Sequence, residues 1–194
     1  METTWTQPIL VTGPSSEPVT LAQARKQLEI ASSDTIHSDQ LTLLIQAARE
    51  QWEADTDAAC LTQTWKVYFD SFYDYKLRLP KRPVASITSL KYYDATNTQQ
   101  TLATSYYSLD TASRSVRLKY QQTWPAAVDR WDAVEVTYVC GYANAAAVPA
   151  ISKQAILLLV GKYFENRDLL VNDVIFTDAA YESLVKKFMR SCYP

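Results

Sequence analysis

The sequence has 194 residues, 47% of them hydrophobic, which suffices to bury the core of one domain or of one domain with an insertion. Its 19 basic and 21 acidic side chains give a net charge of -2, and this balance argues against a protein that holds duplex DNA by its overall charge. The three glycines are few for an enzyme built on phosphate-binding loops, which need positive φ and close backbone approach.

The spacing of the cysteines and the hydropathy of the sequence indicate the cellular compartment in which the protein is expected. Cys60, Cys140 and Cys192 form an odd set with wide spacing, which favours reduced thiols over a disulfide framework or a zinc knuckle. The first ten residues lack the basic and apolar regions of a secretory signal, and the longest apolar run, 156–160, is too short to cross a bilayer. We therefore expect a soluble, intracellular product without membrane contact.

The N-terminal third predicts an arm and two helices. Residues 1–18 hold three prolines and a glycine among polar residues, which indicates an extended arm. Thr20 is the expected cap of a first helix that ends near Ile30. Asp39 is the expected cap of a second helix, whose apolar face is formed by Leu41, Leu44, Ile45, Ala48 and Trp52. We expect the other face to meet solvent or a partner through Gln46, Arg49, Glu50 and Glu53.

From residue 61 onward, β-branched and aromatic residues alternate with turn residues, which predicts antiparallel strands. The expected strands are 64–69, 76–79, 87–93, 106–110, 115–119 and 134–139. We expect Trp124 and Trp131, in the loop before the last strand, to plug the end of the β core.

Two further helices follow the strands. Pro149 suits the first turn of a buried helix that extends to Tyr163, and residues 166–168 end it. Residues 178–190 predict an amphipathic C-terminal helix. The predicted fold class is α+β, a helical framework with an inserted antiparallel β domain. Its expected parts are an arm 1–18, a helical part 19–60, a β insert 61–141, a core helix 142–167 and a tail 168–194.

The residues that carry chemistry form no recognisable constellation. His37 is the only histidine, and it lies in a polar connector where a role at the helix flank is expected. Cys60 and Cys140 are expected to be small buried side chains, since no activating base is near in sequence. The carboxylates of the β region lie next to turns, where aspartate stabilises the backbone, namely Asp70, Asp74, Asp94 and Asp110. We expect no catalytic residue, no cofactor and no metal.

The 13 tyrosines and 5 tryptophans are the more informative feature. Such side chains recur at protein interfaces because they bring large contact area with little rotamer entropy to lose, but they also fill the cores of β domains. Stacking on single-stranded nucleic acid requires interleaved cations, and the β insert offers few close by, namely Lys66, Lys76, Arg78 and Lys91.

Four segments resemble, in order, the head-tail connector (adaptor, head-completion) proteins of tailed bacteriophages, of the gp6-like and phiE125 gp8-like type. The first is PVTLAQARKQL at 18–28, and the second is LTLLIQAAREQW at 41–52 with LTQTW at 61–65. The third is LPKRPVASITSLKYYD at 79–94. The fourth comprises VTYVCGY at 136–142, Val148-Pro149, AILLLVGKY at 155–163 and Asn166-Arg167.

The resemblance implies a structural role. Members of that family form a ring, usually twelvefold, beneath the portal of the virion; duplex DNA passes through the ring, and a neck, stopper or tail protein binds below. Assembly in the host cytoplasm is implied as well. The implied portal interface is the C-terminal helix with Tyr181, Leu184, Val185, Phe188 and Met189. The implied subunit interface comprises Gln46, Arg49, Glu50, Glu53, Lys162 and Arg167.

Three alternatives remain open on the sequence. A neck stopper or tail-completion protein also forms rings, although such proteins are mostly β, and the two-helix start argues against one. A ligand-binding or carbohydrate-binding β module would use exposed tyrosines as its platform. An enzyme is the third alternative, and it would have to depend on His37.

Overall fold

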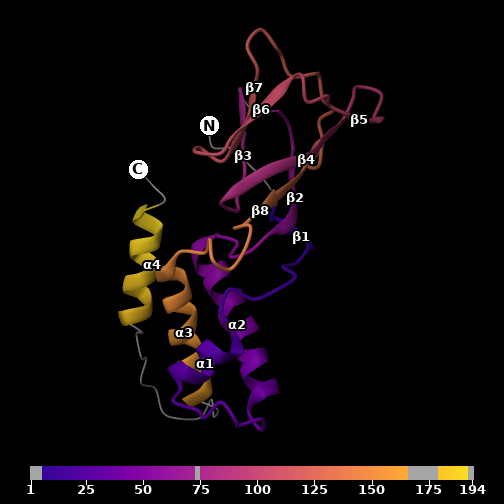
Figure 1. Ribbon diagram of the computed structural model, residues 1–194. Coiled ribbons are helices and arrows are strands. Elements are labelled where there is room, and N and C mark those ends of the chain that lie inside the picture. Colours follow the sequence, from indigo (N-terminus) through magenta and orange to yellow (C-terminus); the bar gives the residue numbers. More distant parts are fainter. Residues whose placement is uncertain (1–5, 73–74, 166–178, 192–194) are drawn as a thin grey trace. The chain divides into compact units, whose positions relative to one another are not determined.

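The computed structural model describes residues 6–72, 75–165 and 179–191 (Figure 1). The chain divides into two compact units: unit 1 comprises Met1–Pro14 and Thr62–Tyr142, and unit 2 comprises Ser15–Leu61 and Ala143–Pro194. Unit 1 carries the strands and unit 2 the helices. The predicted α+β class with antiparallel strands is confirmed.

Unit 1 contains a five-stranded antiparallel sheet in the order β1-β2-β8-β4-β5. These strands are β1 (Ile9–Thr12), β2 (Gln63–Phe69), β4 (Val84–Tyr93), β5 (Gln99–Thr101) and β8 (Val134–Cys140). Burial alternates along β8 with the period of two that a strand imposes. Val67 of β2 lies opposite Val136 of β8, and both are fully buried. This register directs the β-branched side chains of both strands into one core.

A three-stranded antiparallel sheet completes unit 1, in the order β3-β7-β6. Its strands are β3 (Lys76–Arg78), β6 (Tyr107–Asp110) and β7 (Ser115–Leu118). Leu77 pairs with Val116, which pairs with Leu109 on the other side. Leu77 and Val116 are fully buried, so one face of this sheet packs inward and the alternate residues point outward.

All six strands predicted from the sequence are present, and two more were missed. β1 lies in the segment expected to be an unpaired arm, and it pairs antiparallel with β2. β5 is the polar stretch Gln99–Thr101, which pairs with the end of β4. β1 is stabilised by hydrogen bonds to β2, which is distant in sequence, and β5 by hydrogen bonds to β4 across a turn. Neither strand shows the alternation of apolar and polar residues that predicts a strand from sequence.

Unit 2 consists of α1 (Leu21–Gln27), α2 (Ser38–Thr56), α3 (Ala150–Glu165) and α4 (Ala179–Ser191). The predicted cap at Thr20 is confirmed, since its hydroxyl accepts from the Gln23 amide in a capping box. The predicted cap at Asp39 is wrong: α2 begins at Ser38, and Asp39 lies in its first turn. A carboxylate there is still favourable because it faces the positive end of the helix dipole.

The helices of unit 2 enclose an apolar core. α2 packs along α3, and α4 packs against both (Figure 1). The rings of Trp52 on α2 and Phe188 on α4 meet edge to face with centroids 4.9 Å apart. The hydroxyl of Tyr181 donates to Asp55 Oδ2 at 2.6 Å, which ties α4 to the last turn of α2. The buried third helix and the amphipathic C-terminal helix are thus confirmed.

One carboxylate organises the turn between β4 and β5. Oδ1 of Asp94 accepts from the amides of Thr96 and Thr98, at 2.9 and 3.0 Å, and from the Thr96 hydroxyl. Oδ2 accepts from the side-chain amide of Gln100 at 3.0 Å. The hydrogen bond from the Thr96 hydroxyl, followed by that from Gln100, lowers the pKa of Asp94 to about 2.

We predict that Asp94 titrates near pH 2 in the folded protein, whereas an aspartate in the unfolded chain titrates near pH 4. Because the folded pKa is the lower one, the stabilisation is complete above the unfolded pKa and is lost as the pH falls from about 4 to about 2. NMR titration of the side-chain carboxyl measures this directly, and Asp94→Asn should flatten the acid dependence of stability in that window. An Asp94 carboxyl that titrates at pH 4 or above would contradict the prediction.

Candidate assembly surfaces

His37 lies at the flank of α2, and the two described cysteines are buried. Nδ1 of His37 lies 2.8 Å from Asp34 Oδ2, just before α2, and this hydrogen bond is the main cause that lowers the pKa of Asp34. Cys60 and Cys140 form no disulfide and have fully buried side chains, and burial raises the pKa of Cys60. Within the described ranges, no group of three or more His, Cys, Asp or Glu can hold a metal ion.

None of the described helices is both long and apolar enough to cross a membrane.

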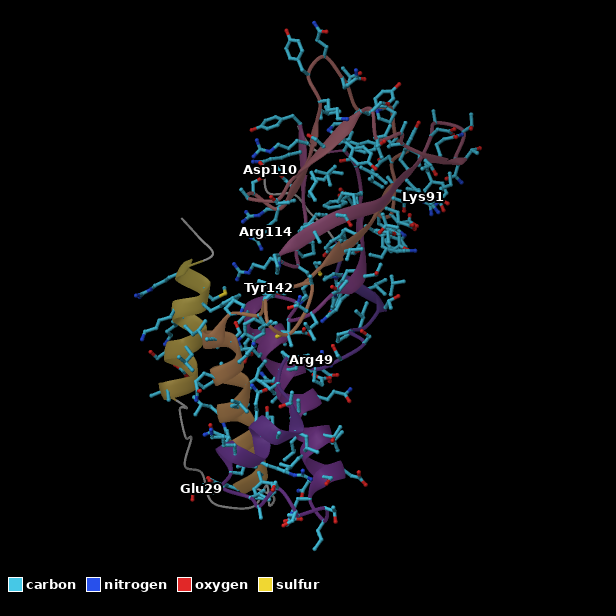
Figure 2. The ribbon with its side chains drawn as sticks, in the orientation of Figure 1. Glu29, Arg49, Lys91, Asp110, Arg114 and Tyr142 are labelled. Carbon is cyan, nitrogen blue, oxygen red and sulfur yellow. The ribbon has the colours of Figure 1, made fainter. Side chains whose placement is uncertain are left out.

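Two of the four residues of α2 that were expected to meet solvent or a partner are buried, so the prediction is corrected for these two. Arg49 is only 5% exposed and Glu53 only 7%. Nε of Arg49 donates to Glu17 Oε2, and Nη1 donates to Glu53 Oε2, each at 2.9 Å. The other oxygen of Glu53 accepts from the Cys60 amide at 2.7 Å. Arg49 and Glu53 therefore connect α2 to the segment before α1 and to the segment after α2, all within unit 2 (Figure 2 labels Arg49).

The exposed stripe of α2 is instead formed by Leu43, Gln46 and Glu50, which follow one another at helical steps of three and four. Leu43 is 64% exposed, and Gln46 donates to Glu50 at 2.9 Å. Leu43 was not predicted as a surface residue, because the neighbouring Leu41 and Leu44 form the apolar face of the helix. Of the other residues named for subunit contacts, Lys162 is half-buried on α3 and Arg167 lies outside the described residues.

The C-terminal helix uses part of its expected portal surface inside the chain. Tyr181 is 8% exposed and Phe188 only 2%, because both pack on α2. Leu184, Val185 and Met189 are half-buried. The side turned to solvent carries Glu182, Ser183, Lys186, Lys187 and Arg190. The expectation that all five apolar residues are available to a partner is therefore corrected for Tyr181 and Phe188.

The edge strand β1 exposes three consecutive apolar side chains. Ile9 is 50% exposed, Leu10 48% and Val11 52%. β1 is the terminal strand of its sheet and pairs with β2 on one side only. An apolar edge strand of this kind is a template for contact with another chain, and isolated proteins usually protect it.

Three exposed tyrosines lie at one end of the three-stranded sheet. Tyr75 precedes β3, Tyr106 precedes β6 and Tyr120 follows β7, and the antiparallel register brings these three strand ends together. They are 53%, 40% and 89% exposed respectively. The predicted plug is only half right, since Trp124 stacks on Phe72 at 4.7 Å, but Trp131 is 65% exposed.

These features define an α+β fold whose distinctive groups are exposed apolar and aromatic side chains. Neither a protein-family model nor a curated protein matches the sequence.

Solved structures share the fold over nearly the whole chain. A chain in the neck of an empty GTA particle, computed with C6 symmetry, matches with a TM-score of 0.77 and 20% identity, covering 94% of this chain and 95% of that one. A chain in the virion of a native gene transfer agent (GTA) particle matches with a TM-score of 0.75 and 21% identity. A chain in the neck of a native GTA particle, computed with C12 symmetry, matches with a TM-score of 0.70 and 21% identity. The last two matches cover 94% of both chains, and at these identities they show a common fold.

Proposed function

We propose that this chain is a structural subunit of the head-tail connector, the adaptor ring, of a tailed bacteriophage or phage-like particle. Copies form a ring, twelvefold by the resemblance, which docks on the portal and carries the neck or tail below. Duplex DNA passes through the ring, and the subunit acts by shape and contact without making or breaking bonds. The observation that carries this proposal is the fold shared over 94% of the chain with chains from the necks of GTA particles.

The exposed surfaces of both units support a protein that is completed by assembly. A ring is closed by heterologous contacts, in which two different patches of each copy meet. The stripe of α2 with Leu43 and the edge strand β1 are two such patches, because each exposes apolar side chains to solvent in the isolated chain. Each patch lies in a different unit, so each copy offers two separate sites of contact.

The portal contact is assigned to α4. Since Tyr181 and Phe188 face the core of unit 2, the contact consists of Leu184, Val185 and Met189 with the basic residues beside them. Lys186, Lys187 and Arg190 give this side of α4 a positive character. An acidic surface on the partner fits such a helix best.

Cosedimentation tests the proposal. Purified full-length protein is mixed with portal-bearing particles that lack all neck proteins, and bound copies are counted after centrifugation. We expect binding that saturates at a ring stoichiometry. Leu43→Arg should reduce the bound copies severalfold, while Ile36→Arg, which replaces an apolar side chain that is 87% exposed in a loop, should not. No binding by the unaltered chain would overturn the proposal, and binding only to particles that already carry an adaptor would assign the chain to a stopper.

The clustered tyrosines favour one second candidate, a carbohydrate-binding β module. Aromatic faces of Tyr75, Tyr106 and Tyr120 at one sheet end offer a stacking platform. A Tyr106→Ser/Tyr120→Ser variant that lost binding on a glycan array, while it still joined particles, would support this candidate.

A further inference from the structure

The outward face of the three-stranded sheet is basic. Lys76 and Arg78 alternate with buried Leu77 on β3, and Arg117 lies on β7 directly opposite Lys76. Like charges that face each other across two strands are unfavourable for folding. Asp110 pairs with Arg117 and offsets part of this repulsion, and a negatively charged ligand on the face would offset more of it.

Arg117 is held in place by a polar network. Its Nη2 lies 2.8 Å from Asp110 Oδ2 and 3.1 Å from the Ser113 hydroxyl, and its Nε donates to the Ser115 hydroxyl at 3.3 Å. The Ser113 hydroxyl also donates to Asp110 Oδ2 at 2.8 Å. The side chain of Arg117 remains 40% exposed, so the network orients the guanidinium while leaving part of it at the surface.

Arg114 adds a cation at the turn between β6 and β7. Its φ of 53° lies in the left-handed region, which glycine or asparagine adopts more readily than a residue with a long side chain. Its carbonyl accepts from the Leu79 amide at 2.7 Å, which joins this turn to the end of β3. Figure 2 shows Arg114 and Asp110 along the same border of the sheet.

The composition of the face distinguishes between two kinds of partner. The strand positions on this side of the sheet hold only polar or charged side chains: Lys76, Arg78, Ser108, Asp110 and Arg117, together with Ser115, which is only 1% exposed. The centres of protein interfaces are depleted of charge and rich in apolar contact. Contacts to the phosphates of nucleic acid, in contrast, are made by Lys, Arg and Ser. The face therefore fits phosphate better than it fits a protein surface.

The charge of the chain is divided unevenly. Unit 1 holds ten Lys and Arg against eight Asp and Glu, whereas unit 2 holds nine against thirteen. Four of the ten cations of unit 1 lie on this face and its turn, with Asp110 as the one carboxylate among the outward strand positions. The net charge of -2 of the whole chain therefore does not reveal this local group of cations.

We infer that the outward face formed by Lys76, Arg78, Arg114 and Arg117 contacts the phosphate backbone of duplex DNA without reading its sequence. The inference rests on the proposed function, in which DNA passes through a ring of these chains. A small number of cations on each subunit binds weakly and exchanges quickly with counterions. Such contacts guide a moving duplex without holding it.

Fluorescence anisotropy with a labelled random-sequence duplex of about 30 base pairs tests the inference, using the purified full-length chain over a series of salt concentrations. Lys76→Gln/Arg78→Gln removes two cations without touching the network of Arg117. It should weaken binding roughly tenfold at low salt and reduce the slope of log affinity against log salt by about 2. The matched control, Lys26→Gln/Lys153→Gln, removes the same charge from two positions of unit 2 outside the contacts assigned above and should leave the slope unchanged.

Unchanged affinity and slope in the double variant of the face would overturn the inference, as would an equal loss in the control. The cosedimentation assay separates this from the proposed function. If the double variant still joins portal-bearing particles but binds DNA like the unaltered chain, only the inference fails. If the unaltered chain does not join particles, the proposed function fails whatever the DNA result. If the double variant loses particle binding and the unaltered chain binds no DNA, the face is a protein-docking surface and the inference is wrong.

Discussion

Replacing Arg49 with methionine is expected to lower the free energy of unfolding of the helical unit by about 3 to 5 kcal/mol. Glu53 is 7% exposed, so removal of the guanidinium leaves a carboxylate in the interior without its opposite charge. Burial by itself lowers the pKa of Arg49, but the charge of Glu53 and the hydrogen bond to Glu17 outweigh it and raise the pKa above its ordinary value. The arginine therefore stays charged, and the attraction acts wherever Glu17 and Glu53 are ionised.

Urea unfolding followed by circular dichroism at 222 nm measures the change, since this signal reports on the helices. Glu50→Gln is the matched control on the same helix: Glu50 also contacts Arg49, at 3.3 Å, but its side chain is 57% exposed, so the expected loss is below about 1 kcal/mol. Glu53→Gln should lie between the two, because the amide oxygen can still accept from the Cys60 amide. A loss for Arg49→Met no larger than that of Glu50→Gln would show that the buried network is not needed for stability.

Truncation of Phe188 to alanine is expected to cost about 3 to 5 kcal/mol. Its ring is 2% exposed and meets the fully buried Trp52 edge to face, so the change removes both apolar burial and an aromatic pair. Because α4 packs on α2 and α3 through this side chain, the loss should appear first as detachment of α4.

Hydrogen exchange of the α4 amides, read together with tryptophan fluorescence during urea unfolding, tests this prediction. Lys187→Ala is the control, since it alters the neighbouring residue on the exposed side of the same helix and should change stability by less than about 0.5 kcal/mol. Protection of α4 that survives Phe188→Ala would mean that the helix is held by contacts other than the Trp52 pair.

Both results bear on the proposed role. Phe188 contacts Trp52 and Tyr181 contacts Asp55, so these two side chains of α4 cannot contact a portal while the helix stays docked on α2. The exposed basic side of α4 is available in the folded chain, so substitutions there should affect particle binding without affecting stability. Lys187→Ala serves both experiments and separates the two effects.

Much of the architecture could be predicted from local pattern alone. The apolar steps from Leu41 to Trp52 define α2 because a helix brings every third or fourth residue to one face. The capping box at Thr20 and the alternation along β8 are similarly local, since each depends on residues within one element. The α+β class, the strand-forming region and the four helices follow from such signals.

The surfaces could not be predicted in the same way. The polar periodicity of α2 predicted that Arg49 and Glu53 meet solvent or a partner. In the structure, Glu17 from the segment before α1 contacts Arg49, and the Cys60 amide from the segment after α2 donates to Glu53. The same holds for α4, whose apolar stripe indicates burial without saying whether the chain itself or a partner provides it.

The sequence by itself determined the four helices and the six predicted strands, their order and the lack of a recognisable catalytic motif. Only the tertiary structure decided which faces remain open. It made β1 an exposed edge, and it brought Lys76 opposite Arg117, 41 positions further along the chain. The physical reason is that side-chain direction within an element depends on neighbouring residues, whereas strand register and burial depend on partners distant in sequence.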